Sequence, residues 1–243
     1  MYEKRIYRDK MKGEGLEYFR VVEFESDLEI AISTEGYHEG MTEQEVLAKI
    51  QAVRKVLTDY QQHNPEFFPA LQPIPVKSED PLLIRKMKMA SHAADVGPMA
   101  AVAGAVSDAV GRDLMKKNQE VIVENGGDLF LKTTHTRQVA IDTGKSGFNG
   151  LKIEIAPQSI PLGICTSSGT MGHSLSFGKA DAATIISHDV LLSDAVATAV
   201  GNRVKTGENI TEAIEWARQI HGVRGILIIA DGKLGAWGEI KLV

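Results

Sequence analysis

The sequence lacks the features that define several common classes of protein. Its 243 residues include a single cysteine, Cys165, so the chain can form neither an intramolecular disulfide nor a thiolate cluster for zinc. No run approaches the roughly 18 apolar residues of a membrane span. The N-terminus, MYEKRIYRDK, is charged where a signal peptide is apolar. We therefore expect a cytoplasmic protein with no membrane partner.

Excess positive charge and two common hydrolase motifs are absent as well. The net charge of −5 at pH 7 argues against a nucleic-acid partner. The chain contains neither G-x-x-x-x-G-K-[ST] nor G-x-S-x-G, which argues against a P-loop NTPase and an α/β-hydrolase. The remaining composition, 43% hydrophobic and 24% charged, is typical of a globular protein with a substantial core.

The apolar patterns near the N-terminus predict strands followed by a helix. Alternating side chains in residues 17–33 predict two antiparallel strands. Thr42 and Glu45 form a T-x-x-E capping box, and apolar residues at helical spacing continue from it to Tyr60. This spacing predicts an amphipathic helix with one buried stripe.

A Pro-rich connector, residues 63–76, follows this helix. We expect a single domain, with an N-terminal portion over residues 1–76 and a main portion over 77–243. The main portion is predicted to contain strands at 120–132, 136–142, 151–156, 161–167 and 182–187, helices from Pro98, at 193–204 and at 210–222, and a C-terminal hairpin turning at Asp231-Gly232.

The segment ENGGDLF is the first that could carry chemistry. Gly126 and Gly127 let a ligand or a second backbone approach without interference from a Cβ atom, and Asn125 and Asp128 can bind a polar group or fix the loop. By itself this pattern is more often a tight turn between two strands than a binding site.

The segment CTSSGTMGHSLSFG (165–178) is the second. Its backbone N–H groups and hydroxyls suit a phosphate group. The residues that we expect to contribute are Thr166, Ser167, Ser168, Gly169 and Thr170. His173 could donate or accept a proton, although a lone histidine is more often structural. Cys165 has no basic neighbour in sequence, so we expect a buried, inert thiol.

Asp194 and Thr198 form the third candidate. They lie four residues apart, so on a helix both oxygens point from one face, a geometry that suits a hard cation such as Mg²⁺. In the alternative interpretation Asp194 caps the start of its helix and Thr198 bonds back to the Asp194 carbonyl.

The basic stretch IRKMKMASH (84–92) is a weaker candidate. Arg85, Lys86 and Lys88 could offset the charge of an anionic ligand in an otherwise acidic protein. The alternative, which we favour, is a solvated helix face.

Taken together, the segments resemble the ApbE family of FAD:protein FMN transferases. VIVENGGDLF, TSSG with a following histidine, and LLSDAVATAV correspond in order to that family's N-[AG]-G-G-D-[IL], T-S-G and A-D-A-[LW]-A-T-A segments. The whole chain is similar to the UPF0280 group, an ApbE-like branch that shares the GPMAAVAGA, NGGD and SSGTMGHS segments. The resemblance implies an α+β, ApbE-like fold with mixed or mainly antiparallel sheets and packed helices.

The resemblance also implies a site for a flavin nucleotide. It places Mg²⁺ at Asp194 and Thr198, completed by a main-chain oxygen near Ala100, beside the diphosphate of FAD. The N-G-G-D and T-S-S-G segments would line the nucleotide pocket. His173 stands in the place of the family's catalytic histidine, and Asp128 is a second group that could handle protons.

Two classes of function follow from this resemblance. The first is an enzyme that cleaves FAD or transfers its FMN part to a protein acceptor that the sequence does not identify. The second is a protein that holds a flavin or another nucleotide without turnover, or uses the scaffold for protein contacts. The chain departs from the family after His173, where Ser-Leu-Ser-Phe-Gly replaces I-[IVL]-[DN]-P-x-T-G. Either class is compatible with a homo-oligomer.

Overall fold

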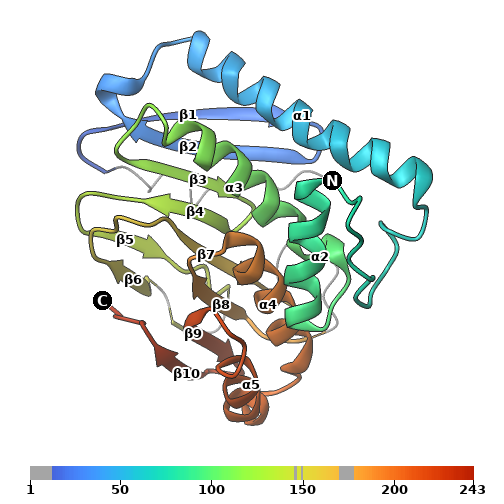
Figure 1. Ribbon diagram of the computed structural model, residues 1–243. Helices are drawn as coiled ribbons and strands as arrows, with labels where there is room; N and C mark the ends of the chain where they lie inside the picture. Colours follow the sequence, from blue (N-terminus) through green and yellow to red (C-terminus); the bar gives the residue numbers. More distant parts are fainter. Residues whose placement is uncertain (1–12, 145–146, 149, 170–177) are drawn as a thin grey trace.

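The computed structural model describes residues 13–144, 147–148, 150–169 and 178–243. Its main element is an eight-stranded sheet with the strand order β1-β2-β3-β4-β7-β8-β9-β10, in which every neighbouring pair is antiparallel (Figure 1). A separate two-stranded sheet holds β5 and β6. The strands are β1 (Leu16–Glu23), β2 (Ser26–Ser33), β3 (Val121–Asn125), β4 (Asp128–Lys132), β5 (Arg137–Ala140), β6 (Lys152–Ile155), β7 (Leu162–Ser167), β8 (Ala182–Ser187), β9 (Val223–Ala230) and β10 (Lys233–Gly238).

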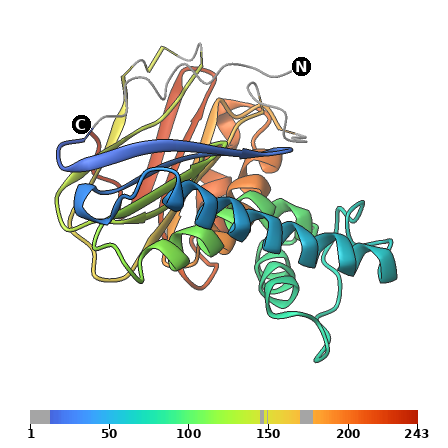
Figure 2. The same ribbon diagram turned by 90° about the horizontal axis from the view of Figure 1, so that it is seen from above.

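Helices pack against the large sheet and enclose the larger apolar core. They are α1 (Met41–His63), α2 (Leu82–Ala94), α3 (Val102–Leu114), α4 (Val190–Arg203) and α5 (Ile210–Ala217), and the 3-10 turn η3 (Pro98–Ala101) leads into α3. Figure 2 shows α1, α2 and α3 on one side of the sheet. A second apolar cluster joins the sheet to β5 and β6. The fold is therefore α+β with mainly antiparallel sheets, as the sequence predicts.

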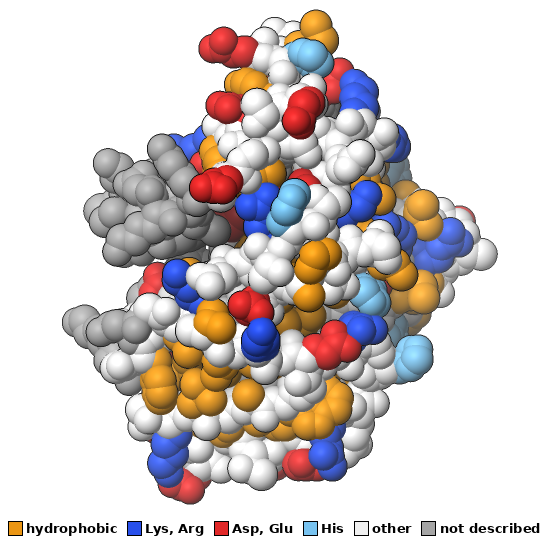
Figure 3. All heavy atoms as spheres, turned by 90° about the vertical axis from the view of Figure 1, so that its left-hand side faces the viewer, with side chains coloured by type: hydrophobic (Ala, Val, Ile, Leu, Met, Phe, Trp, Pro, Cys, Tyr) orange, Lys and Arg blue, Asp and Glu red, His pale blue; other side chains and the backbone are white. Residues whose placement is uncertain are grey.

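The surface in Figure 3 mixes charged and apolar side chains, and hydrophobic ones gather in its lower half. None of the helices in the described ranges is long and apolar enough to cross a bilayer.

Several local predictions are confirmed. The apolar stripe of α1 buries Val46, Ile50 and Leu57 against the core. At the C-terminal hairpin, Asp231 and Gly232 have φ angles of 50° and 69°. Left-handed values at both positions are those of a two-residue type I′ turn between β9 and β10.

The predicted capping box of α1 is wrong. The helix begins directly after Gly40, whose φ of 74° is left-handed and which provides no side-chain cap. Thr42 lies inside the first turn and accepts a hydrogen bond from the His38 N–H at 2.9 Å, while Glu45 forms an ion pair with Lys117 at 2.8 Å. The left-handed backbone conformation at Gly40 determines where the helix starts, and a T-x-x-E pattern does not detect it.

The prediction of a solvated face is wrong for Lys88. Its side chain is 1% exposed, and its Nζ donates to Tyr60 Oη at 2.8 Å, to the Pro75 carbonyl at 3.0 Å and to Asp80 Oδ2 at 2.8 Å. Burial alone would lower the pKa of Lys88, but the interactions with Asp80 and Tyr60 raise it, so the ammonium is retained. Lys86, in contrast, is exposed as predicted.

Candidate functional site

The first turn of α3 lies directly against Asp194 of α4. The Gly104 N–H donates to Asp194 Oδ2 at 2.7 Å. A Cβ atom at Gly104 would lie 2.9 Å from the Asp194 Cβ, so glycine permits this close approach. The η3 turn, which contains Ala100, also packs against α4. The expected proximity of the two helices is therefore confirmed.

Asp194 is a buried carboxylate that lacks a cationic side-chain partner. It is 7% exposed, and no lysine, arginine or histidine of the described chain forms an ion pair with it. Burial raises the pKa of Asp194 to about 7, although hydrogen bonds from the Gly104 and Ala103 N–H groups act in the opposite direction. A divalent cation at this position would supply the missing positive charge.

The alternative that Asp194 caps its own helix is wrong. The N-cap of α4 is Asp189, whose carboxylate accepts hydrogen bonds from Leu191 N–H at 3.0 Å and Leu192 N–H at 3.2 Å. Asp194 lies in the second turn of α4 and receives N–H groups from the start of α3. Asp194 therefore belongs to α4 but accepts hydrogen bonds from the first turn of α3.

Asp128 adds a second carboxylate to the same region. It pairs with Cys165 across β4 and β7. Burial raises the pKa of the Cys165 thiol, and the charges of Asp128 and Asp194 raise it further, so both carboxylates lie close to the sulfur. Cys165 is fully buried, in agreement with the predicted inert thiol. The region therefore contains two carboxyl groups, those of Asp128 and Asp194, close to one thiol.

The N-G-G-D segment forms the tight turn between β3 and β4. Gly126 and Gly127 have left-handed φ angles of 70° and 105°, which explains why both are glycines. The turn contacts the end of β7, because the Thr166 N–H donates to the Gly127 carbonyl at 3.1 Å. Asn125 donates from its side-chain amide to the Ala103 carbonyl at 3.2 Å. Asn125 and Asp194 thus both form hydrogen bonds with the first turn of α3.

The T-S-S-G segment lies at the end of β7, beside the second half of α4. The Thr166 and Thr184 hydroxyls are 2.8 Å apart, and a Cβ atom at Gly201 would lie 3.1 Å from Ser167 Oγ. Gly169 donates its N–H to the Ala180 carbonyl at 2.8 Å, and Ser168 is half-buried. The structure therefore brings the η3–α3 junction, the β3–β4 turn, the end of β7 and α4 together.

Two predicted site residues, Thr170 and His173, lie outside the described residues. Thr198 is half-buried, one turn after Asp194 on α4. Within the described ranges, no three His, Cys, Asp or Glu side chains gather to hold a metal by themselves. Mg²⁺ commonly takes one or two carboxylates and completes its shell with water and phosphate oxygens, so one carboxylate and one hydroxyl remain compatible with it.

Sequence reasoning missed three residues that shape this region. Glu124 accepts a hydrogen bond from the Gly127 N–H at 2.9 Å and so stabilises the turn. Gly104 has no Cβ atom, which allows the Asp194 side chain to lie against α3. The small-residue run after Pro98 was a signal for close helix packing, but it did not indicate which helix would approach. Asp189 before an apolar run was a detectable N-cap signal.

Two solved structures that share this fold are flavin transferases named ApbE. The apo form of the flavinyl transferase ApbE from Pseudomonas stutzeri matches with a TM-score of 0.63 and 15% identity, over 92% of this chain and 94% of that chain. The flavin transferase ApbE from Vibrio cholerae matches with a TM-score of 0.63 and 11% identity, over 92% and 97% of the two chains. At these identities the likeness shows an ApbE-like fold alone.

Sequence comparison gives the family within that fold. The chain matches the family described as "AbpE bacteria" over residues 8–234. It is 37% identical over 196 residues to a UPF0280 protein of Methanosarcina acetivorans, covering 80% of this chain and 78% of the relative. A UPF0280 protein of Methanothermobacter thermautotrophicus is 38% identical over 192 residues, covering 77% and 75%. The chain belongs to the UPF0280 family.

Proposed function

We propose that this protein binds FAD with Mg²⁺ at Asp194 and acts on the FAD diphosphate, by hydrolysis or by transfer of the FMN part to an acceptor. The observation that carries the proposal is the buried Asp194 carboxylate, which has hydrogen-bond donors but no cationic side-chain partner in the described chain. The flavin transferases that share the fold support a flavin nucleotide as the substrate class.

The donor set around Asp194 fits a magnesium ion. Asp194 supplies a carboxylate, Thr198 a hydroxyl one turn later, and the η3 turn with Ala100 lies against the same helix. Bound Mg²⁺ would stabilise negative charge on the diphosphate oxygens. The Gly104 N–H holds Asp194 Oδ2, so the carboxylate is oriented before any ligand arrives.

The chemistry that we propose is substitution at the FMN phosphorus. The oxygen of water or of an acceptor hydroxyl forms the new P–O bond, the phosphoanhydride bond breaks, and AMP leaves with the electron pair. Asp128 or His173 accepts the proton that the attacking oxygen loses. The N-G-G-D turn and the T-S-S-G segment, adjacent through Gly127 and Thr166, would contact the nucleotide.

The test is incubation of the pure protein with FAD and MgCl₂, followed by separation of FAD, FMN and AMP. Native protein should release AMP in a Mg²⁺-dependent reaction, and Asp194→Asn should not. Lys55→Gln, an exposed change on α1, is the control and should match the native protein. AMP release that persists in EDTA, or in Asp194→Asn, would contradict the assignment of the metal to Asp194.

A second candidate is an FAD-binding protein without turnover. The departure after His173, where Ser-Leu-Ser-Phe-Gly replaces the family's polar residue and proline, favours it. In the same experiment this function predicts Mg²⁺-dependent retention of FAD by the protein, with no FMN or AMP formed.

A further inference from the structure

A pocket separate from the candidate flavin site opens at the start of α4. It encloses about 480 Å³ and is lined by residues of α2, α3, the end of β8, the β8–α4 connection, α4, and the start of β9 with the two residues before it. None of the residues assigned above to FAD or Mg²⁺ lines it. Its volume falls in the range of small-molecule sites.

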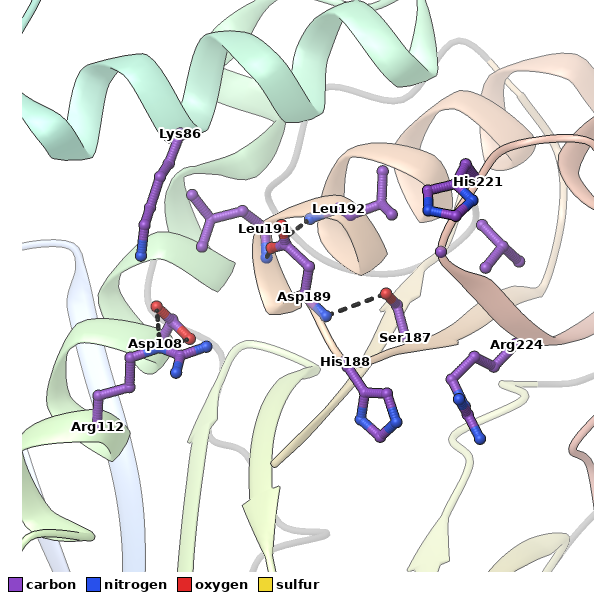
Figure 4. Close-up of a pocket in the computed structure, with 12 residues that line it drawn as sticks. Lys86, Asp108, Arg112, Ser187, His188, Asp189, Leu191, Leu192, His221 and Arg224 are labelled. Carbon is purple, nitrogen blue, oxygen red and sulfur yellow. Dashed lines mark hydrogen bonds and ion pairs between the residues drawn. The ribbon is translucent and has the colours of Figure 1, made fainter. Parts of the chain in front are cut away.

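Cationic and donor side chains converge on this pocket from different elements. Figure 4 shows Lys86 reaching from α2 toward Asp108 and Arg112 of α3, with His188 below and His221 and Arg224 on the opposite side. Lys86 and His221 are exposed and make no hydrogen bond or ion pair within the described chain. Two of the converging groups are therefore available to a ligand.

Arg112 is the other basic group of the pocket that retains donors for a ligand. Arg112 contacts both Asp108 oxygens, at 2.7 and 2.9 Å, through its Nε alone, so both terminal nitrogens remain. His188 donates from Nδ1 to the Pro161 carbonyl at 3.0 Å, so Nε2 of the neutral ring is an acceptor and not a donor for an anion. Arg224 is engaged by Glu239 and contributes less.

The acceptors of the pocket are mostly engaged. Asp108 is paired with Arg112, and Ser187 Oγ accepts the Asp189 N–H at 3.0 Å. Asp189 uses Oδ1 on the first turn of α4, which leaves Oδ2 as an acceptor for a ligand hydroxyl. The groups that remain for a ligand are thus the donors of Lys86, Arg112 and His221 and the Oδ2 atom of Asp189.

The floor of the pocket is apolar. Leu191 and Leu192 are 3% and 7% exposed, and Val223 is 8% exposed. A ligand that fits this arrangement has an anionic group for the donors, a hydroxyl for Asp189 and a small organic body over the leucines.

We propose that this pocket is a binding site for a small hydroxylated phosphate monoester, such as a sugar phosphate. The phosphate group lies between Lys86 and the terminal nitrogens of Arg112, and a ligand hydroxyl donates to Asp189. The proposal does not depend on flavin binding, since no residue is shared between the two sites.

The test is calorimetric titration of the full-length protein, without Mg²⁺, with ribose 5-phosphate and with ribose as the uncharged counterpart. Ribose 5-phosphate should bind and ribose should not. Lys86→Gln should weaken binding at least about tenfold, the loss expected for one charge-assisted hydrogen bond. His221→Gln should weaken it by a smaller factor, because His221 lies on the opposite side of the pocket from Lys86 and Arg112. Both side chains are exposed and unpartnered in the described chain, so both variants should remain folded.

Two control variants make the test specific to this pocket. Lys55→Gln makes the same change of charge on α1, and Asp194→Asn alters the candidate flavin site; both should bind ribose 5-phosphate as the native protein does. Absence of binding at concentrations up to about 10 mM, a weak-binding limit, would overturn the proposal. Equal affinity for ribose and ribose 5-phosphate would overturn it as well. Unchanged affinity in Lys86→Gln would show that the phosphate binds elsewhere.

Discussion

Asp194→Asn should stabilise the protein when divalent cations are removed. The pKa of Asp194 is raised from 3.8 to about 7, so the folded state disfavours the charged carboxylate. At 1.36 kcal/mol for each pKa unit, the full penalty is about 4 kcal/mol. The penalty is absent below about pH 4, where the carboxyl is protonated in both states, grows as the pH rises, and is complete above about pH 7.

Asparagine keeps an oxygen that can accept the Gly104 N–H, while alanine does not. Asp194→Ala would leave this buried N–H without its acceptor, at a cost of about 1–3 kcal/mol. In EDTA at pH 8 we therefore expect Asp194→Asn to be more stable than both the native protein and Asp194→Ala. Adding Mg²⁺ should stabilise the native protein and neither variant, because only the native protein keeps the carboxylate.

Urea denaturation in EDTA and in MgCl₂ measures these differences. Asp59→Asn, an exposed change on α1, is the control and should alter the free energy of unfolding by no more than about 0.5 kcal/mol. A less stable Asp194→Asn protein in EDTA would refute the reasoning, because it would mean that the N–H groups of α3 compensate the buried charge completely.

Three further predictions concern other parts of the chain. Burial alone would raise the pKa of Glu120, but hydrogen bonds from Thr134, His135 and Arg137 lower it to about 2. This stabilisation should be lost as the pH falls from about 4.5 toward 2, and urea denaturation over that range should show a smaller decline for Glu120→Gln. Lys88→Ala would leave Asp80 buried without its cation and should lower the free energy of unfolding by about 3–5 kcal/mol, measured by thermal unfolding. A change of less than about 1 kcal/mol would contradict the assignment of a buried ion pair. Gly104→Ala places a Cβ atom 2.9 Å from the Asp194 Cβ and should lower the free energy of unfolding by about 1–3 kcal/mol. It should also weaken Mg²⁺-dependent FAD binding in a titration. Unchanged FAD affinity would mean that the contact between α3 and Asp194 does not support the metal site.

Local periodicity predicted most elements because the spacing of apolar residues within each element indicates which of its faces is buried. The alternating runs in residues 17–33 became β1 and β2, and the spacing from Val46 to Leu57 became the buried stripe of α1. Asp231-Gly232 determined the C-terminal turn through its backbone geometry. These are interactions between residues close in sequence.

Contacts between distant residues could not be predicted in the same way. Asp194 meets Gly104 from 90 positions away, and nothing near Asp194 distinguishes a cap on α3 from a cap on α4. From the sequence Lys88 is expected at the surface, because only the fold brings Asp80 and Tyr60 into contact with it. The resemblance to the ApbE family selected the segments of the site, while the structure showed that Asn125 holds α3.

Titration of FAD into the protein, with MgCl₂ and with EDTA, tests the central claim most directly. We predict that the native protein binds FAD at least about 100-fold more tightly with Mg²⁺ than with EDTA, a difference of about 2.7 kcal/mol. Asp194→Asn should show no Mg²⁺ dependence, and Thr198→Val, which keeps the carboxylate, should retain part of it. Equal FAD affinity in Mg²⁺ and EDTA for the native protein would contradict the account, and would leave Asp194 as a residue that only joins α3 to α4.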